Sequence, residues 1–284
     1  CRAVAALGIP VVYYVSPQVW AWRRGRLRAM QRFVTRALVI FPFEERLYRD
    51  HAIPVTFVGH PLFDLAAPTV LRGPFRQEHG LDPQAPTVAV LPGSRSNEVR
   101  LILPDLVCAA ERIAHAVPTV QFVVARAPHV TDALLEPLRA LEAVTSRPAC
   151  VVEGRTNDVL AAADVVLTAS GTATVQTAIH GRPMVVVYRL SPLTYLLGRR
   201  FVRVDAFGMV NLVAERKIVP EFLQEDFTPE VVAAEAVRFL TDEAHAARTR
   251  ADLREVREKL GGPGASRRAA EQVLAVAAEG RGCG

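Results

Sequence analysis

Residues 87–95 read TVAVLPGSR, and this stretch decides the fold. Its first five residues, 87–91, favour a buried strand, and the turn after them leads directly into an amphipathic stretch at 97–116. Gly93 lets the backbone come close to a ligand, because glycine has no side chain. The amides of the helix start and the Arg95 guanidinium are donors that suit a phosphate. The stretch therefore predicts a strand, a turn with an anion site, and a helix.

A second turn of the same character lies at residues 169–172, which read ASGT. It follows a predicted strand at 164–168 and precedes a predicted helix at 173–180 that ends at Gly181. Serine and threonine also cap helices for purely structural reasons, so one such turn is weak evidence. Two of them at the carboxyl ends of strands in one sheet are better evidence, because ligands of doubly wound folds bind there. Together they predict a phosphorylated ligand, with a nucleotide favoured.

Short Val/Ile/Leu-rich runs alternate with helical stretches through almost the whole chain. This pattern is typical of an α/β protein whose parallel sheet is covered on both faces. Proline and glycine between residues 61 and 86 predict a domain boundary, which gives domains at 1–70 and 71–250 and a helical segment at 251–284. Strands are predicted at 11–15, 37–41, 55–58, 87–91, 120–125, 150–152, 164–168 and 184–188, and further helices at 131–144 and about 266–278.

The charge distribution is uneven. The formal net charge is +5, and all seven charged residues before Glu44 are arginines. Such an excess indicates phosphate groups, nucleic acid or a membrane surface as partner, or simply a solvated helix. No apolar run is long enough to span a bilayer, and neither the four cysteines nor the seven histidines have metal-ligand spacing. The chain also lacks P-loop and dinucleotide-binding patterns, which disfavours ATP hydrolysis and NAD chemistry.

Seven motifs follow one another along the chain. They are YYVSPQVWAW at 13–22, FPFEERLY at 41–48, VTFVGHPL at 55–62, LPGSRSNEV at 91–99, ASGTATVQ at 169–176, PMVVVYRLSPLTY at 183–195 and NLVAERKIVPEFLQ at 211–224. In this order they resemble the lipid-A-disaccharide synthases, over about residues 8–243. The first and last motifs are the most specific in combination, while LPGSR and SGT are shared more loosely with other GT-B glycosyltransferases.

The resemblance implies a GT-B fold, with two Rossmann-like parallel-sheet domains facing a cleft and the first domain incomplete in this chain. It implies transfer of 2,3-diacylglucosamine from UDP-2,3-diacylglucosamine to 2,3-diacylglucosamine 1-phosphate, with inversion and without metal or cofactor. The expected location is cytoplasmic and peripheral on the inner membrane, whose anionic surface is a partner. Nucleic acid is not expected, and a homodimer is left open.

Functional residues carried over by the resemblance lie mostly in the second domain. Two positions depart from the family pattern: Gln176 stands where glutamate is usual, and Glu215 where glycine is common. An amide accepts a ribose hydroxyl less strongly than a carboxylate does. The residues expected to bind nucleotide or donor are Gly93, Ser94, Arg95, Ser170, Gly171, Thr172, Gln176, Asn211, Glu221 and Gln224.

No catalytic base is named, because the resemblance places it in an N-terminal loop and strand that this sequence does not contain. Glu44 and Glu45 are the nearest acids to the motifs of the first domain. Acids at a helix start more often cap the helix than catalyse a reaction, and capping is the favoured interpretation of both.

The arginine-rich segment is expected to meet the acceptor or the membrane through Trp20, Trp22, Arg24 and Arg28. Interfacial helices combine basic and aromatic residues in this way, and Arg24, Arg28, Arg32 and Arg36 would share one helix face at a spacing of four. The tryptophans could instead pack into the core. Residues 195–203, YLLGRRFVR, are a second candidate for membrane contact.

Two other functions stay open at this point. One is another GT-B enzyme, either a lipid-linked N-acetylglucosaminyltransferase or a UDP-sugar epimerase, although neither is expected to carry YVSPQVWAW. The other is a non-catalytic protein that binds UDP and lipid. UDP release that requires both lipids would identify the synthase.

Overall fold

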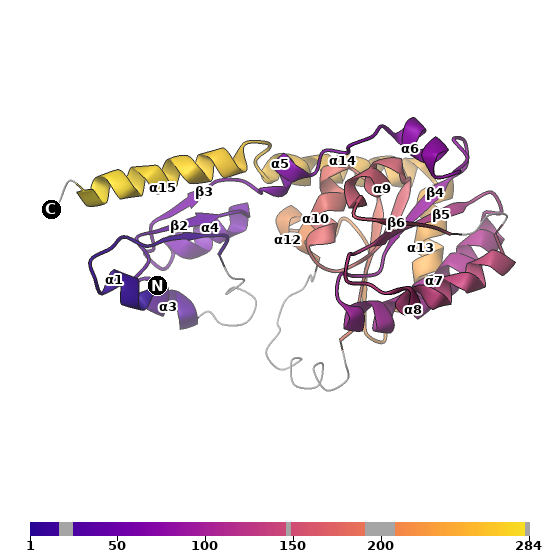
Figure 1. Ribbon diagram of the computed structural model, residues 1–284, viewed down its shortest axis with the longest axis horizontal. Coiled ribbons are helices and arrows are strands. Elements are labelled where there is room, and N and C mark those ends of the chain that lie inside the picture. The colour runs from indigo at the N-terminus through magenta and orange to yellow at the C-terminus, as the bar shows by residue number, and fades with distance from the viewer. Residues whose placement is uncertain (17–24, 146–148, 191–207, 282–284) are drawn as a thin grey trace. The chain divides into compact units, whose positions relative to one another are not determined.

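The computed structural model describes residues 1–16, 25–145, 149–190 and 208–281. Within these ranges the chain forms two compact units, each built on a parallel sheet (Figure 1). Unit 1 holds residues 1–65 and 257–281, and unit 2 holds residues 66–190 and 208–256. No helix among the described residues has both the length and the apolar character that a membrane span requires.

Unit 2 contains a six-stranded parallel sheet in the order β6-β5-β4-β7-β8-β9. All five residues of β4 are buried, as expected for a central strand covered on both faces. The register places Val88 opposite Phe122 on one side and Val165 on the other. The strands are β4 (Thr87–Leu91), β5 (Gln121–Arg126), β6 (Cys150–Glu153), β7 (Val165–Ala169), β8 (Met184–Tyr188) and β9 (Glu221–Leu223).

The main core of unit 2 lies where the helices α7 and α13 pack on this sheet. Ile102, Leu106 and Ile113 of α7 and Val232 of α13 are fully buried there. The apolar residues of α7 recur every three to four positions, so they share the face toward the sheet. The helices are α6 (Arg72–Glu78), α7 (Ser96–Ala116), α8 (Asp132–Leu135), η1 (Glu136–Ala143, a 3-10 helix), α9 (Thr156–Ala162), α10 (Thr172–Ile179), α12 (Met209–Ala214), α13 (Pro229–Thr241) and α14 (Glu243–Lys259).

Unit 1 contains a three-stranded parallel sheet in the order β1-β2-β3. One face carries a core around Leu27, Tyr48 and Ile53. On the other face Ala269 packs against Leu38. The elements are α1 (Arg2–Ala5), β1 (Val12–Tyr14), α3 (Gly25–Met30), β2 (Arg36–Val39), α4 (Pro42–Arg49), β3 (Val55–Phe57), α5 (Leu62–Leu65) and α15 (Ala265–Arg281).

The C-terminal helix α15, yellow in Figure 1, is held in unit 1 by polar contacts at its start. The Asp64 carboxylate accepts hydrogen bonds from the Gly264 amide at 2.6 Å and the Ser266 amide at 3.1 Å, and these bonds lower the pKa of Asp64. Arg268 donates to the Val58 carbonyl at 2.8 Å. A carboxylate at a helix N-terminus is the favoured arrangement for the helix dipole. The helix is therefore joined to a segment about two hundred residues earlier in the sequence.

Two helices differ from expectation. The arginine-rich helix is shorter than predicted, because α3 ends at Met30 and Arg36 already belongs to β2. Arg36 donates to Gln272 at 3.0 Å. The Thr35 hydroxyl accepts a hydrogen bond from the Val11 amide at 2.9 Å and so anchors the start of β2. The prediction that Arg36 shares a helix face with Arg28 is therefore wrong. The predicted helix 131–144 splits into α8 and η1, since Pro137 has no amide to continue an α-helix.

Candidate functional site

Both anion-suited turns open into one pocket of unit 2. The pocket has a volume of about 300 Å³ and lies at the carboxyl ends of β4, β5 and β7. This edge of a parallel sheet is where ligands bind in doubly wound folds. The structure thus brings together seven of the predicted residues: Gly93, Ser94, Arg95, Ser170, Gly171, Thr172 and Gln176.

The first turn requires glycine for two reasons. Gly93 has a φ of +125°, a conformation that residues with a side chain rarely adopt. A Cβ atom added there would also lie 2.9 Å from the Cβ of Glu98. The turn is therefore folded tightly against the first helical turn of α7.

Glu98 is a pocket residue that sequence reasoning missed. Its Oε2 accepts hydrogen bonds from the Ser94 amide at 3.3 Å and the Arg95 amide at 3.4 Å, and its Oε1 pairs with Arg95 Nη1 at 2.7 Å. These amides were expected to be donors for a phosphate, and in the structure they donate to Glu98. The available signal was a glutamate three residues after the helix cap, the spacing of a capping box.

The second turn lacks such a carboxylate. Gly171 caps α10 with a φ of +153°, and no acid stands in the first turn of that helix. The Ser170 amide is bonded to the Val187 carbonyl at 2.8 Å, which ties the turn to β8. Gly171 and Thr172 are exposed at the pocket. This turn offers its backbone and hydroxyl groups without a competing negative charge of its own.

Gln176 lines the pocket one turn into α10, and its amide is oriented by α9. Its Nε2 lies 3.4 Å from the Oδ1 of Asn157, and His180 Nε2 lies 3.3 Å from the same oxygen. When the Gln176 amino group donates to Asn157, the Gln176 carbonyl oxygen at the other end of the amide points away from Asn157. Asn157 was not foreseen from the sequence, because it stands 19 residues earlier.

The three remaining predicted donor-site residues lie outside the pocket lining. Asn211 is buried and bonds the loop before β9: its Nδ2 donates to the Val219 carbonyl at 2.9 Å and to Glu221 at 2.6 Å. Glu221 also accepts from the Gly208 amide at 3.0 Å. The Gln224 side chain accepts from the Leu190 amide at 2.7 Å. In the structure, these side chains shape the backbone around β8 and β9.

Glu215 also has a backbone explanation. It caps the end of α12 with a φ of +60°, in the left-handed region that favours glycine. The glycine that the family commonly has at this place would adopt this conformation without strain.

Tyr188, at the end of β8, is a second residue near the first turn that sequence reasoning did not single out. Burial raises the pKa of its hydroxyl, the Glu98 carboxylate raises it further, and Arg95 lowers it. The tyrosine is therefore neutral at pH 7, when it can donate a hydrogen bond.

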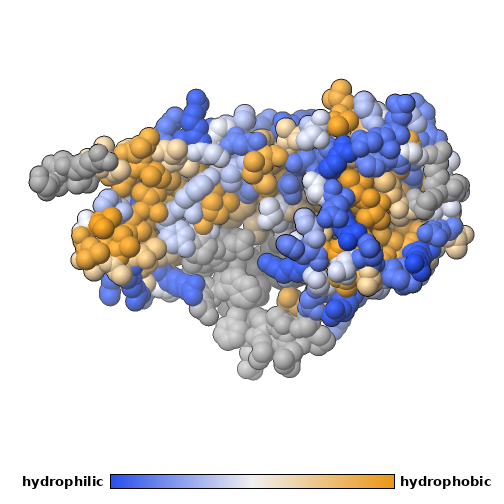
Figure 2. Space-filling view, viewed as in Figure 1, coloured by the Kyte–Doolittle hydropathy of each residue, from blue (hydrophilic) through white to orange (hydrophobic). Residues whose placement is uncertain are grey.

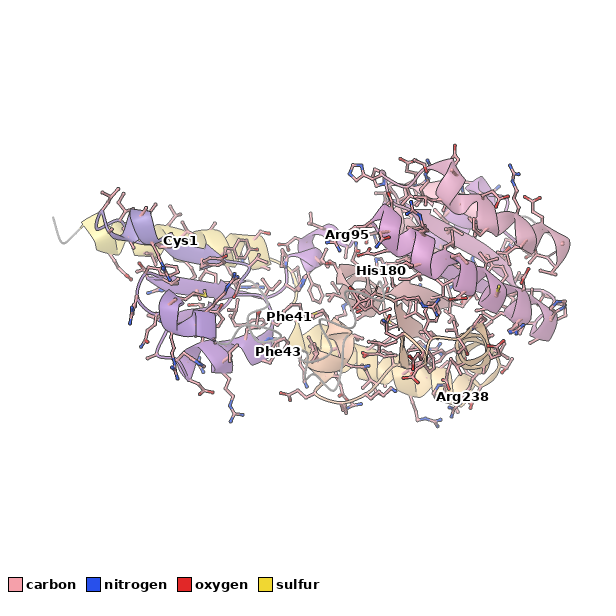
Figure 3. The ribbon with its side chains drawn as sticks, turned by 90° about the horizontal axis from the view of Figure 1, so that it is seen from below. Cys1, Phe41, Phe43, Arg95, His180 and Arg238 are labelled. Carbon is pink, nitrogen blue, oxygen red and sulfur yellow. The ribbon has the colours of Figure 1, made fainter. Side chains whose placement is uncertain are left out.

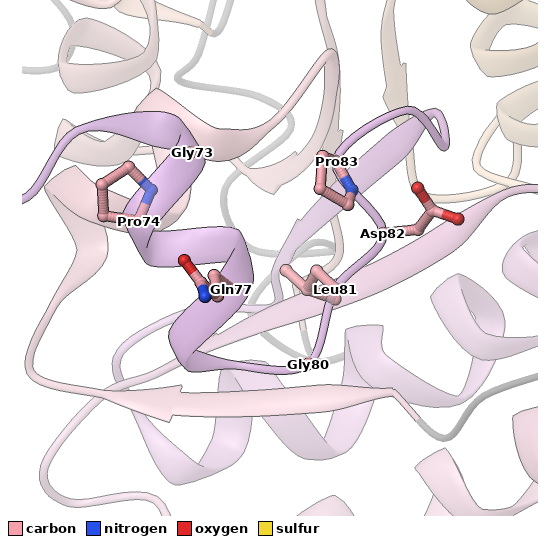
Figure 4. A pocket seen from close by; sticks show the side chains of 7 residues that line it. All are labelled: Gly73, Pro74, Gln77, Gly80, Leu81, Asp82 and Pro83. Atoms are coloured by element: carbon pink, nitrogen blue, oxygen red, sulfur yellow. The ribbon is translucent and has the colours of Figure 1, made fainter.

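A second depression lies beside α6 (Figure 4). Its lining comes from α6 and the loop that precedes β4, and Asp82 is its one ionisable residue. It therefore lies at the amino end of β4, whereas ligands of such sheets bind at the carboxyl ends. The pocket between the two turns is the stronger candidate.

The predicted residues of unit 1 are only partly described. Trp20, Trp22, Arg24 and residues 195–203 lie outside the described residues, while Arg28 is exposed on α3. The capping interpretation of Glu44 is confirmed, because this buried carboxylate accepts a hydrogen bond from the amide of Phe41, the residue before α4, at 3.2 Å. Figure 3 labels Phe41 and Phe43 at this helix start.

His60 is a buried titratable group within one of these motifs. It is buried, and burial lowers its pKa to about 4, so the imidazole is neutral at pH 7. Its Nδ1 accepts from the Leu62 amide at 3.2 Å. Among the residues that the structure describes, no cluster of three His, Cys, Asp or Glu side chains could hold a metal ion.

Comparison with known proteins gives concordant matches. A family model described as lipid-A-disaccharide synthetase matches residues 4–276. A lipid-A-disaccharide synthase of Geobacter sulfurreducens is 43% identical over 273 residues, which are 96% of this chain and 70% of the relative. The match to the UDP-GlcNAc 2-epimerase of Neisseria meningitidis, solved with UDP-GlcNAc, has a TM-score of 0.63 at 12% identity. It covers 96% of this chain and 71% of the epimerase chain. The match to MurG of Acinetobacter baumannii has a TM-score of 0.56 at 16% identity and covers 95% of this chain and 68% of that MurG chain.

The structural matches have low sequence identity and show the fold alone, which confirms the predicted GT-B class. The matches in sequence extend over nearly the whole chain and include both turns of the pocket. The chain therefore belongs to the lipid-A-disaccharide synthase family, the glycosyltransferases that act in lipid A biosynthesis.

Proposed function

We propose that the pocket of unit 2 binds the UDP part of UDP-2,3-diacylglucosamine. The chain then transfers the diacylglucosamine to 2,3-diacylglucosamine 1-phosphate, which yields a lipid A disaccharide 1-phosphate and UDP. The observation that carries this proposal is the convergence of two glycine-containing helix starts and Arg95 in one pocket. Helix starts and guanidinium groups are the usual partners of phosphates in proteins.

Each part of the pocket suits a part of the nucleotide. Arg95 neutralises charge that develops on the departing UDP, and such electrostatic stabilisation is a major source of catalysis. The backbone of the second turn supplies further donors from Gly171 and Thr172. The Gln176 carbonyl, oriented by Asn157, accepts a hydrogen bond from a ribose hydroxyl.

An assay of UDP release tests the proposal. The protein is incubated with UDP-2,3-diacylglucosamine, with and without the acceptor lipid, and UDP and disaccharide are measured together. We expect both products only when both lipids are present. Conversion of a UDP-sugar without acceptor would instead identify an epimerase, and tight UDP binding without turnover a binding protein.

We also propose that unit 1 associates with an anionic membrane surface, which makes the protein peripheral on the cytoplasmic face of the inner membrane. Arg26, Arg28 and Arg32 are exposed. Leu7 and Ile9 expose 75% and 50% of their surface on the same unit. Figure 2 shows apolar surface, in orange, over the part that holds α1 and α15. Basic and apolar groups on one surface are typical of interfacial proteins.

Liposome co-sedimentation tests the membrane proposal. Each basic residue near an anionic leaflet contributes about 1 kcal/mol, and the attraction decays over a Debye length of ~8 Å at physiological salt. We therefore expect binding to anionic vesicles that weakens at high salt and in the double variant Arg26→Glu with Arg28→Glu. The pair Arg100→Glu with Arg254→Glu, exposed on unit 2, is the matched control. Equal binding to neutral vesicles would contradict an electrostatic anchor.

A further inference from the structure

Glu98 bonds the donors of the first turn that the nucleotide is proposed to use. We infer that its carboxylate competes with the ligand's diphosphate, so that the pocket favours a UDP-sugar over the more highly charged free UDP. This inference rests on the proposed function of the pocket. It makes Glu98 a specificity-determining residue and a cause of product release.

Three donors converge on this carboxylate. The amides of Ser94 and Arg95 reach one oxygen, and Arg95 Nη1 reaches the other. Two amides and a guanidinium are also what a phosphate group accepts from at a helix start. Glu98 therefore fills the coordination that the first turn would give to a phosphate.

These contacts can be exchanged at little cost. The two amide bonds, at 3.3 and 3.4 Å, are longer than the usual 2.9 to 3.0 Å. The Arg95 side chain is 80% exposed, and ion pairs in that setting are weak because water screens them. A diphosphate with more charge than one carboxylate can displace Glu98 from all three donors.

Displacement does not remove the negative charge from the pocket. Glu98 is fixed to the first turn of α7, and its Cβ would touch a Cβ at position 93. The displaced carboxylate consequently remains near the bound phosphates, where like charges repel. Among the described residues, Tyr188 interacts electrostatically with Glu98, and Arg95 is the positive group paired with it.

The repulsion depends on the charge of the ligand. In a UDP-sugar both phosphates are esterified, and each carries one negative charge. Free UDP ends in a phosphate whose second ionisation has a pKa of about 6, so this phosphate carries nearly two charges at neutral pH. Glu98 therefore disfavours the product UDP more than the donor, which promotes release of UDP after transfer.

Titration calorimetry at pH 8 and low salt tests the inference with three probes: uridine, UDP-GlcNAc and UDP. The variant Glu98→Gln removes the charge and keeps the helix cap, because glutamine also serves in capping boxes. We expect it to bind UDP about tenfold more tightly, UDP-GlcNAc about threefold more tightly, and uridine unchanged. Glu111→Gln removes the same charge from the same helix outside the pocket lining, and we expect it to change none of the three affinities.

The outcomes separate the inference from the proposed function. If the parent binds UDP and Glu98→Gln binds it equally or more weakly, Glu98 merely positions Arg95 and the inference is overturned while the function stands. An equal gain for uridine would also overturn it, since uridine has no phosphate. If the parent does not bind UDP, both fail. Glu98→Ala, a second uncharged variant, must give the same ranking of the three probes.

Discussion

The turn after β4 and the turn after β7 line the same pocket, yet their electrostatics differ. The first turn has Arg95 and Glu98 within one turn of helix, and the carboxylate bonds both the backbone and the guanidinium. The second turn has a glycine cap, Gly171, and no acid in the first turn of its helix. Both turns look alike in sequence, as a small glycine-containing loop between a strand and a helix.

The difference assigns the turns different tasks. Among the described residues, the second turn contributes backbone and hydroxyl groups to the pocket and no charged side chain of its own. We expect phosphate binding there to depend less on neighbouring side-chain charge than at the first turn. At the first turn we expect the ligand to exchange with Glu98, so that the strength of binding depends on the balance between Glu98 and Arg95. Experiments that remove charge, backbone freedom or one hydrogen bond therefore affect the two turns unequally.

The largest expected effect on ligand binding comes from removing the cation of the first turn. Arg95→Ala should weaken UDP binding by ~1.5 to 3 kcal/mol, the range for hydrogen bonds to charged groups. The upper part of this range is expected, because Glu98 loses its counter-ion while remaining beside the phosphates. Titration calorimetry measures the effect.

Measuring the effect of Arg95→Ala in a Glu98→Gln protein makes this test more specific. In a Glu98→Gln protein the loss of Arg95 should cost less, because the repulsion that Arg95 offsets is already gone. A double-mutant cycle isolates the coupling between the two residues. Additive effects of the two substitutions, or unchanged UDP affinity in Arg95→Ala, would contradict the assignment of the first turn.

Sequence patterns predicted the framework of this site well. The predicted strands 87–91 and 184–188 agree with β4 and β8 at both ends. The convergence of the turns followed from a parallel sheet, whose strands all end at one edge. The short strand β9 was missed, since three residues after a proline give no periodicity to recognise.

Contacts within the site were harder to foresee than the elements that carry them. Asn157 orients Gln176 because the fold brings their side chains within hydrogen-bond reach, and nothing in the sequence around Gln176 indicates that pairing. Asn211 was predicted at the donor, and the sequence did not show that its amide also bonds the backbone of Ile218 and Val219. Arg28 and Arg36 were placed on one helix because their spacing fits, while Thr35 and the β2 pairing end the helical segment earlier. Local spacing does not encode these tertiary choices.

Backbone substitutions act on folding stability rather than on ligand binding. Gly171→Ala should reduce the free energy of unfolding by about 1 to 3 kcal/mol, because its backbone lies in a region that is nearly exclusive to glycine. Gly93→Ala should cost at least about 1 kcal/mol more, since the new Cβ also overlaps Glu98 at 2.9 Å. Denaturant unfolding followed by circular dichroism measures both.

Gly80→Ala, with a φ of +65° and no atom within 4 Å of the added Cβ, is the control for backbone strain alone. Equal losses at positions 93 and 171 would mean that the first turn is not packed against Glu98.

The smallest expected effect concerns Gln176, beyond the second turn. Gln176→Glu should tighten UDP binding about fivefold, since a charged acceptor strengthens a hydrogen bond by ~1 kcal/mol. The gain is limited because the new carboxylate faces the Asn157 Oδ1, so the Asn157 amide must rotate to donate its amino group. Calorimetry with UDP and with its 2′,3′-dideoxy analogue makes the test specific: the analogue has no ribose hydroxyls and should gain nothing.

His180→Gln, which alters the other neighbour of Asn157, serves as a matched control and should leave the difference between the two ligands unchanged. Equal gains for both ligands would place the Gln176 side chain away from the ribose. The second turn would then contribute its backbone alone to nucleotide binding, and the contrast with the charged first turn would widen.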